Sequence, residues 1–112
     1  MSLAQEIAGE IAAYKTHDIT LRRLTGTQRV AIEVTTPAIV RGYQPHERVG
    51  LLQEGDRQVI IGDVEIVRRR WPGPPRDGDE TIIDGKTAHL VSCETVRFAG
   101  ETVRHNLVVR GA

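Results

Sequence analysis

The chain has 112 residues and equal numbers of basic and acidic side chains, 15 of each, so its formal net charge is zero. This length is typical of one domain with a single hydrophobic core. A net charge of zero argues against a protein held on nucleic acid by bulk electrostatic attraction, because counterion release requires a basic surface. Cys93 is the only cysteine, which excludes an internal disulfide and a cysteine-rich metal site.

Neither a signal peptide nor a membrane span is recognisable in the sequence. The first residues lack a basic stretch followed by a long apolar run. No apolar run approaches the roughly 20 residues of a spanning helix. We therefore expect a soluble protein that is made inside the cell and has no membrane partner.

The first expected element is a helix over Ser2–Tyr14, within an N-terminal segment of residues 1–17. Ser2 and Gln5 match a capping box. An apolar stripe recurs at helical spacing through Leu3, Ile7 and Ile11. Because so short a helix is marginal alone, we expect these three residues to be interface residues, docked on the chain's own sheet or on a neighbouring subunit.

From Asp18 onward the period of the apolar residues changes to two, which is typical of strands. The expected strands begin at Ile19 and Val30, cover Ile39–Tyr43 and run from Gln58 to Val67. Gly62 and Asp63 predict a turn or bulge within the last of these. Pro37 favours an edge position or a strand start, because proline cannot donate to a ladder.

The last third of the chain contains two turn signals. Asp84-Gly85 supplies the positive φ angles of a type I′ turn, between strands at Thr81–Ile83 and Lys86–Ser92. Ala99-Gly100 predicts a second hairpin. The expected fold is mainly β, with six to seven strands in a small β-barrel or sandwich over residues 18–112 and one N-terminal α-helix.

Two long segments, residues 42–56 and 68–79, interrupt this pattern. Each is broken by proline or glycine and carries several charges. Loops of this length usually either serve a function or lack order. We expect both of them to contact partners.

The second loop opens with Arg68, Arg69 and Arg70, followed by Trp71, and three interpretations are open. Arginines beside an aromatic ring can hold phosphates or stack on bases. They can also anchor a protein interface, or form solvated surface while Trp71 folds back on the domain. We favour a protein interface that extends to Arg76, with charge pairing that sets the docking orientation.

The sequence offers no catalytic, cofactor-binding or metal site. The four histidines have no spacing typical of a metal motif, and we assign no role to them: His17, His46, His89 and His105. If the Ala99-Gly100 turn has two residues, His105 faces Glu94 as a surface pair. Ser92 lacks a nucleophile elbow, and Cys93 is expected to be a small buried hydrophobe. We therefore predict a protein that is not an enzyme and needs no cofactor.

The C-terminal part, GDETIIDGKTAHLVSCETVRFAGETVRHNLVVRG, resembles the ending of tailed-phage neck proteins of the head-closure, or head–tail joining, type. In that family a Gly-Asp opens a strand, a hairpin follows, and the last strand finishes near Arg-Gly. The segments that carry the pattern here are Gly78-Asp79, Ile82–Gly85, Leu90-Val91 and Leu107–Gly111. Asp18–Leu24 and Gln53–Ile61 fit the layout upstream, so the resemblance covers roughly residues 18–111.

The resemblance implies a structural subunit of a ring in the neck of a phage or a phage-like particle, such as a gene transfer particle. Such a ring closes the filled head, connects the portal or adaptor to the tail and surrounds an axial DNA channel. The implied partners are copies of the chain, the adjacent portal, adaptor and tail proteins, and DNA in transient, non-specific contact. Assembly would take place in the host cytoplasm.

In such a ring, residues 42–56 are the better candidate for the channel side. Arg41, Arg48 and Arg57 would meet DNA phosphates, while nearby acidic residues keep the contact weak. Two alternatives stay open: another ring component of the neck or tail, such as a tail-terminator or a tube-like protein, and a small binding module of the OB or SH3-like kind.

Overall fold

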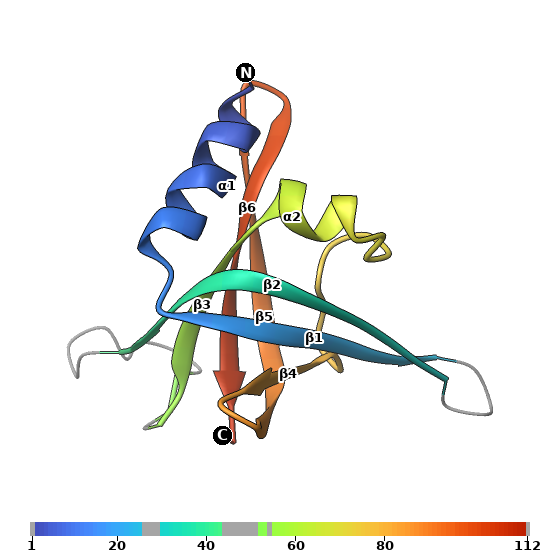
Figure 1. Cartoon of the computed structure of the whole chain (residues 1–112). Helices are drawn as coiled ribbons and strands as arrows, with labels where there is room; N and C mark the ends of the chain where they lie inside the picture. Colours follow the sequence, from blue (N-terminus) through green and yellow to red (C-terminus); the bar gives the residue numbers. More distant parts are fainter. Residues whose placement is uncertain (1, 26–29, 44–51, 54, 112) are drawn as a thin grey trace.

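The computed structural model describes residues 2–25, 30–43, 52–53 and 55–111. Within these ranges the chain forms a closed antiparallel barrel with the strand order β1-β2-β3-β6-β5-β4 (Figure 1). The helices are α1 (Leu3–Tyr14) and α2 (Asp63–Arg68), and the strands are β1 (His17–Thr25), β2 (Val30–Gly42), β3 (Arg57–Gly62), β4 (Glu80–Ile83), β5 (Lys86–Phe98) and β6 (Glu101–Arg110). The expected mainly β barrel with an N-terminal helix is confirmed.

The core of the barrel consists almost entirely of aliphatic side chains. Burial alternates along β6, where every second residue from Val103 to Val109 faces inward. The buried members from other strands include Ile19, Leu21, Ile61 and Leu90. Burying one such side chain contributes roughly 1.5–3 kcal/mol, so packing of this kind supplies most of the driving force for folding.

Helix α1 begins with the predicted capping box. The Ser2 hydroxyl accepts a hydrogen bond from the Gln5 amide at 3.2 Å, and Gln5 Oε1 accepts one from the Ser2 amide at 3.0 Å. Ile11 is buried, and the helix packs against β6 and β3. Gly62 permits this close approach, because a Cβ atom there would lie 3.2 Å from Ala8. Of the two alternatives left open by the sequence, the helix therefore docks on its own barrel. It does so through Ile11 of the predicted stripe and two alanines, whereas Leu3 and Ile7 are only half-buried.

Both predicted hairpin turns are present. Asp84 and Gly85 have φ angles of 53° and 77°, and Ala99 and Gly100 have 51° and 79°. The first turn joins β4 to β5 and the second joins β5 to β6. Both residues of each pair thus adopt the positive φ that a type I′ turn requires, at some steric cost for the non-glycine residue.

The predicted strand from Gln58 to Val67 is wrong in its second half. β3 ends at Gly62, and Asp63–Arg68 forms the short helix α2. Asp63 and Glu65 lie in its first turn, where carboxylates stabilise the positive end of a helix. Alternation over so few residues does not distinguish a strand from one helical turn. The expected loop at 68–79 consequently starts one residue late, because Arg68 closes α2.

Pro37 lies on a strand edge, as one of the two expected alternatives has it, and not at a strand start. Val30–Gly42 is one continuous strand, and Pro37 lies within it, paired with Asp18 of β1. The ladder between β2 and β3 begins only at Ala38. Pro37 therefore lies where β2 has no strand on its second side, so its missing N–H costs no ladder bond.

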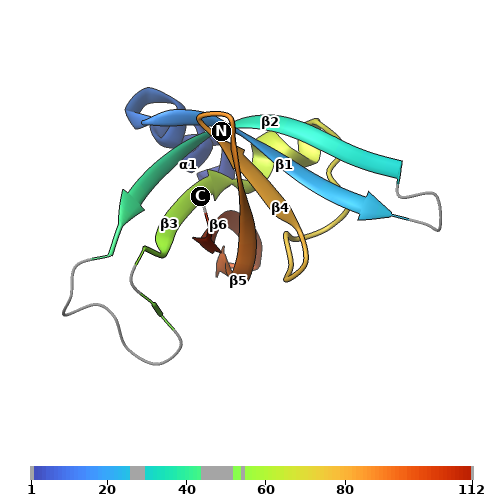
Figure 2. The same ribbon diagram turned by 90° about the horizontal axis from the view of Figure 1, so that it is seen from below.

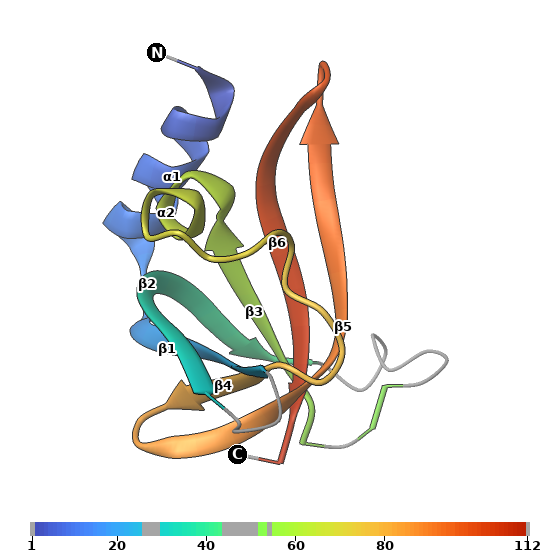
Figure 3. The same cartoon turned by 90° about the vertical axis from the view of Figure 1, so that its right-hand side faces the viewer.

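Two strand pairs extend beyond the closed part of the barrel. β4 pairs with β1 only over Thr20–Arg22 and with β5 only over Lys86–His89. The outer half of the β5–β6 hairpin therefore rises beside α1 (Figures 1 and 3). The far end of the β1–β2 pair projects outward from the barrel (Figure 2).

Candidate functional site

The predicted interface anchor Trp71 is buried in the barrel core, with 4% of its surface exposed. The guanidinium of Arg23 lies 4.9 Å from the centre of its ring, a cation–π contact. A core with few aromatic residues gains much apolar area from this one large ring. The prediction that Trp71 contacts a partner is therefore wrong. Trp71 instead folds back on the domain, as one of the three interpretations had it.

An ion pair between Arg23 and Asp79 fixes the loop that follows α2. Arg23 Nε and Nη2 each donate to a carboxylate oxygen of Asp79 at 2.7 Å. The same guanidinium donates to the carbonyl oxygens of Pro72 and Pro74. Burial lowers the pKa of Arg23, but its hydrogen bond to Asp79 is the larger effect and raises the pKa. The Gly78-Asp79 motif therefore holds the loop against β1.

The four arginines predicted at this interface differ in how they are engaged. Arg68 and Arg69 both pair with Glu65, one turn earlier in α2. Arg70 and Arg76 are exposed and form no ion pair with any residue that the structure describes. Arg70 has a φ of 65°, so the chain reverses there directly after the helix. Arg70 and Arg76 are therefore the members of this set that are open to a partner.

The three arginines predicted for a channel are only partly described. Arg48 lies outside the described residues, as does His46. Arg41 is exposed on β2, where its Nε donates to Gln58 Oε1 at 2.8 Å. Arg57 is half-buried on β3 opposite Gly42, the neighbour of Arg41. The structure thus brings Arg41 and Arg57 to the same end of the β2–β3 pair.

A second ion pair closes the same end of the barrel. Arg110, at the end of β6, donates through two nitrogens to Asp56 at 2.8 and 2.9 Å. The hydrogen bond from Arg110 holds the pKa of Asp56 below its usual value. Asp56 also accepts the amide of Gln53 at 2.9 Å. This contact is structural, because it ties the start of β3 to the end of the chain.

His105 does not face Glu94, contrary to the prediction. A register shift beside Val96 places His105 opposite Thr95 and Glu94 opposite Asn106. His105 is also buried rather than on the surface, with 1% exposure. The two-residue turn is present, and the shift arises from the extra residue that β6 inserts at Val103, a β-bulge.

The buried imidazole joins two elements through polar contacts. His105 Nε2 lies 2.8 Å from Asp63 Oδ1 at the start of α2, and Nδ1 lies 3.1 Å from Thr95 Oγ1. Cys93 Sγ is 4.0 Å from the same Nδ1. Burial raises the pKa of the Cys93 thiol, which disfavours the nucleophilic thiolate. The arrangement is suited to fastening α2 to the β5–β6 hairpin.

Sequence reasoning missed all three polar clusters, because each joins distant positions. Asp63 and His105 are separated by 42 positions, Asp56 and Arg110 by 54, and Arg23 and Asp79 by 56. Gly78-Asp79 was the only signal, and it was interpreted as a strand opening.

The remaining described histidines lie beside acidic residues: His17 is 3.1 Å from Asp84, and His89 is 3.8 Å from Glu80.

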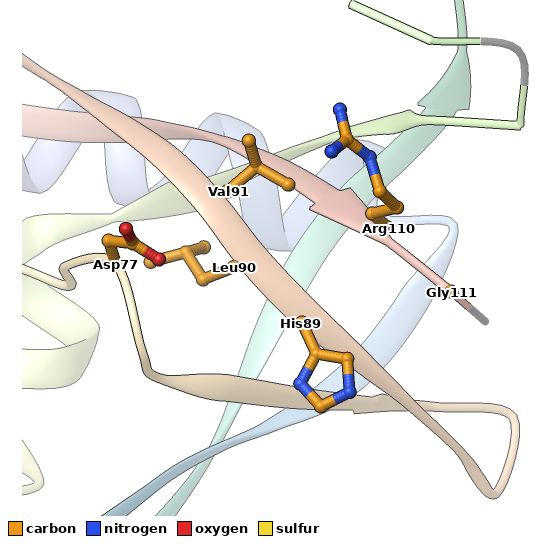
Figure 4. A pocket seen from close by; sticks show the side chains of 6 residues that line it. All are labelled: Asp77, His89, Leu90, Val91, Arg110 and Gly111. Atoms are coloured by element: carbon orange, nitrogen blue, oxygen red, sulfur yellow. The ribbon is translucent and has the colours of Figure 1, made fainter.

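A shallow hollow of about 380 Å³ lies beside β5 and the end of β6 (Figure 4). Asp77 lies at one end of it and Arg110 and Gly111 at the other, with His89, Leu90 and Val91 between them. Because Arg110 is already bonded to Asp56, the polar groups do not converge on one point. The hollow has no arrangement of acid, base and nucleophile that would define a reaction.

Among the described residues, no three His, Cys, Asp or Glu side chains are grouped so as to hold a metal ion. Neither described helix is long and apolar enough to cross a membrane. Comparisons of the chain with protein-family models, curated proteins and solved structures gave no match.

Proposed function

We propose that the chain is a structural subunit of a ring in the neck of a tailed phage or a phage-like particle, where it closes the head and connects it to the tail. The resemblance noted in the sequence is one support. Its motif positions fall at structurally meaningful places: Asp79 binds Arg23 before β4, and Asp84-Gly85 forms the β4–β5 turn.

The observation that carries the proposal is the division of the chain into a self-contained barrel and projecting parts. The barrel holds its own loops and ends through Arg23–Asp79 and Asp56–Arg110. The far end of the β1–β2 pair and the outer half of the β5–β6 hairpin extend outward from it (Figures 1 and 2). Phe98, next to the tip of the hairpin, is 64% exposed. Exposed parts that project beyond the closed barrel are available to neighbours in an assembly.

The ring has two further kinds of contact in this proposal. Arg70 and Arg76 supply charge on the segment after α2, where pairing sets orientation more than affinity. Arg41 and Arg57 are on the channel side together with Arg48, and their contact with DNA is weak so that DNA can slide. The partners are copies of the chain and the adjacent portal, adaptor and tail proteins.

Deletion of the gene tests the proposal in the cells that produce the particles. The expected result is DNA-filled heads and separate tails that do not join, with joining restored by the intact gene. Normal, infectious or transducing particles in the deletion strain would contradict a role in the neck. An OB or SH3-like binding module would leave particle assembly unchanged.

A further inference from the structure

Two strands of the barrel each have one long edge without a strand partner among the described residues. β5 pairs with β6 along its length, but β4 covers its other side only up to His89. Its second edge is therefore open over Val91–Phe98. β2 pairs with β1 from Val30, but β3 joins its other side only at Ala38. Its second edge is open over Val30–Pro37, a stretch of the same length.

The register identifies which backbone groups of β5 face the open edge. In a two-residue hairpin turn the flanking pair, Phe98 and Glu101, is hydrogen-bonded. The N–H and C=O groups of every second residue before it, Arg97, Thr95 and Cys93, therefore point away from β6. Beyond the bulge near Val91, the amide of Leu90 points the same way and donates to Asp79 O at 2.9 Å. This edge thus already accepts one backbone partner from outside the hairpin.

Both edges carry part of the usual protection against pairing with another chain, but each has a stretch without a strand partner. The β5 stretch contains Glu94, Arg97 and two register shifts against β6, and both helices contact β2. Edge strands are normally protected by several charges, by bulges or by a covering element. The β2 stretch has one charged residue, Glu33, which is paired with Arg22 at 2.9 Å, and Pro37 protects only its end. An exposed apolar side chain, Phe98, lies at the end of the β5 edge. Such edges are suited to occupation by a strand.

We propose that the β5 edge of one copy pairs with the β2 edge of the next copy, so that one sheet continues across the subunit boundary. The inference rests on the ring proposed above and names its subunit contact. Pairing two different edges is a head-to-tail contact, which repeats from copy to copy and closes a ring when the rotation between copies closes. Pairing β5 with β5 would form a two-fold dimer and leave both β2 edges open. The head-to-tail contact is the single kind of contact that occupies both edges of every copy.

Cross-linking between single-cysteine variants tests this contact. In a Cys93→Ser background, Arg97→Cys marks the β5 edge, and Ala31→Cys and Thr35→Cys mark the β2 edge; all three positions are exposed. A mixture of a β5 variant and a β2 variant is treated with a short bis-maleimide at the highest soluble concentration. We expect a 97–31 or 97–35 product, and a ladder of multimers from the double variant Thr35→Cys/Arg97→Cys. Glu10→Cys, on the exposed face of α1, serves as the control that should not cross-link.

A proline substitution tests the same edge through the backbone. Arg97→Pro removes an N–H group that faces the open edge and leaves the bonds between β5 and β6 in place. We expect it to abolish the oligomers that form at high concentration, while Arg97→Ala retains them. Circular dichroism shows whether both variants are folded. Equal oligomer formation by folded Arg97→Pro and Arg97→Ala would contradict pairing at this edge.

The same cross-links in purified particles separate this inference from the proposed function. If the chain is present in necks but gives neither the 97–31 nor the 97–35 product, the edge pairing is wrong and the neck function is retained. If the cross-links form in solution but the chain is absent from particles, the edge pairing is retained and the neck function is wrong. Products that join only Arg97→Cys to Arg97→Cys, or no product in solution and in particles, overturn the proposed contact.

Discussion

At the residue scale, the buried pair of Arg23 and Asp79 is the contact on which the segment after α2 depends. Their side chains are 7% and 2% exposed. A buried ion pair adds little net stability over an apolar pair, but loss of one partner leaves an uncompensated charge. Without Asp79, the guanidinium of Arg23 would keep only the carbonyl oxygens of Pro72 and Pro74 as hydrogen-bond acceptors. The pair therefore specifies where the loop lies more than it stabilises the fold.

We predict that Asp79→Ala lowers the free energy of unfolding by about 3 kcal/mol, because it leaves the Arg23 charge buried. Urea denaturation at neutral pH measures the effect. Asp77→Ala is the matched control, since Asp77 is exposed two positions earlier, and its effect should stay within about 0.5 kcal/mol. Equal effects of the two substitutions would contradict the structural role of Asp79.

The pair of Asp56 and Arg110 gives the chain an acid-sensitive contact. Because the hydrogen bond from Arg110 lowers the pKa of Asp56, the folded state favours the ionised carboxylate. The stability that it contributes is complete above the unfolded value near 3.8 and is lost as the pH falls through the lower folded value. We expect Asp56→Asn to flatten the fall in stability below about pH 4.

Denaturation midpoints measured from neutral to acid pH check this expectation. Asp18→Asn is the control, because Asp18 is half-exposed and pairs only with Lys15 within the described part of the chain. An unchanged slope in Asp56→Asn, or an equal change in Asp18→Asn, would assign the acid sensitivity to other carboxylates.

At the scale of elements, local chemistry predicted some features and distant contacts decided the others. The capping box at Ser2 and the turn at Asp84-Gly85 could be predicted because neighbouring residues determine them. Helix α2 could not, because Ile66 fits a strand and a helix equally well until its position in the core is known. The register of His105 depends on one extra residue at Val103, which no local signal marks.

The candidate site followed the same division between local and distant information. The arginines at Arg70 and Arg76 could be predicted as exposed from the proline-rich and glycine-rich context. The burial of Trp71 could not, because it depends on Arg23, which lies far away in the sequence. The open edges of β2 and β5 depend on how far neighbouring strands extend, which a sequence pattern locates only approximately.

Docking of α1 leads to a prediction for this element. Ile11 is 4% exposed against the barrel, so Ile11→Asp would bury a carboxylate without a partner. We expect a loss of about 3 kcal/mol or more in the free energy of unfolding, measured by urea denaturation. Ala12→Asp places the same charge on the exposed side and should have little effect. An Ile11→Asp variant as stable as wild type would mean that the helix does not depend on this docking.

At the scale of the whole molecule, the protein combines a barrel that is complete in itself with parts that are not. The polar clusters and the aliphatic core stabilise one chain. The open strand edges, Phe98 and the arginines after α2 contribute little to that stability. In the proposed ring these parts have different partners. The strand edges join copies of the chain, and the arginines contact an adjacent neck protein.

We predict that reversing the charges at Arg70 and Arg76 yields filled heads that fail to join tails. Neither side chain has an ionic partner among the described residues, so Arg70→Glu/Arg76→Glu should leave the unfolding free energy within about 0.5 kcal/mol of wild type. Electron microscopy of particles from a complemented deletion strain measures the effect. Lys15→Asp/Asp18→Lys, which swaps an exposed pair outside the proposed contacts, is the control. Normal tailed particles from Arg70→Glu/Arg76→Glu would show that these arginines are solvated surface.

The most direct measurement of the central claim is a cryo-electron microscopy map of the neck in particles produced from the genes that surround this one. The account predicts a ring between portal and tail whose subunits accommodate the barrel and its projecting β5–β6 hairpin. A complete neck in which every density is accounted for by other chains, with this chain missing from the particle, would contradict the account.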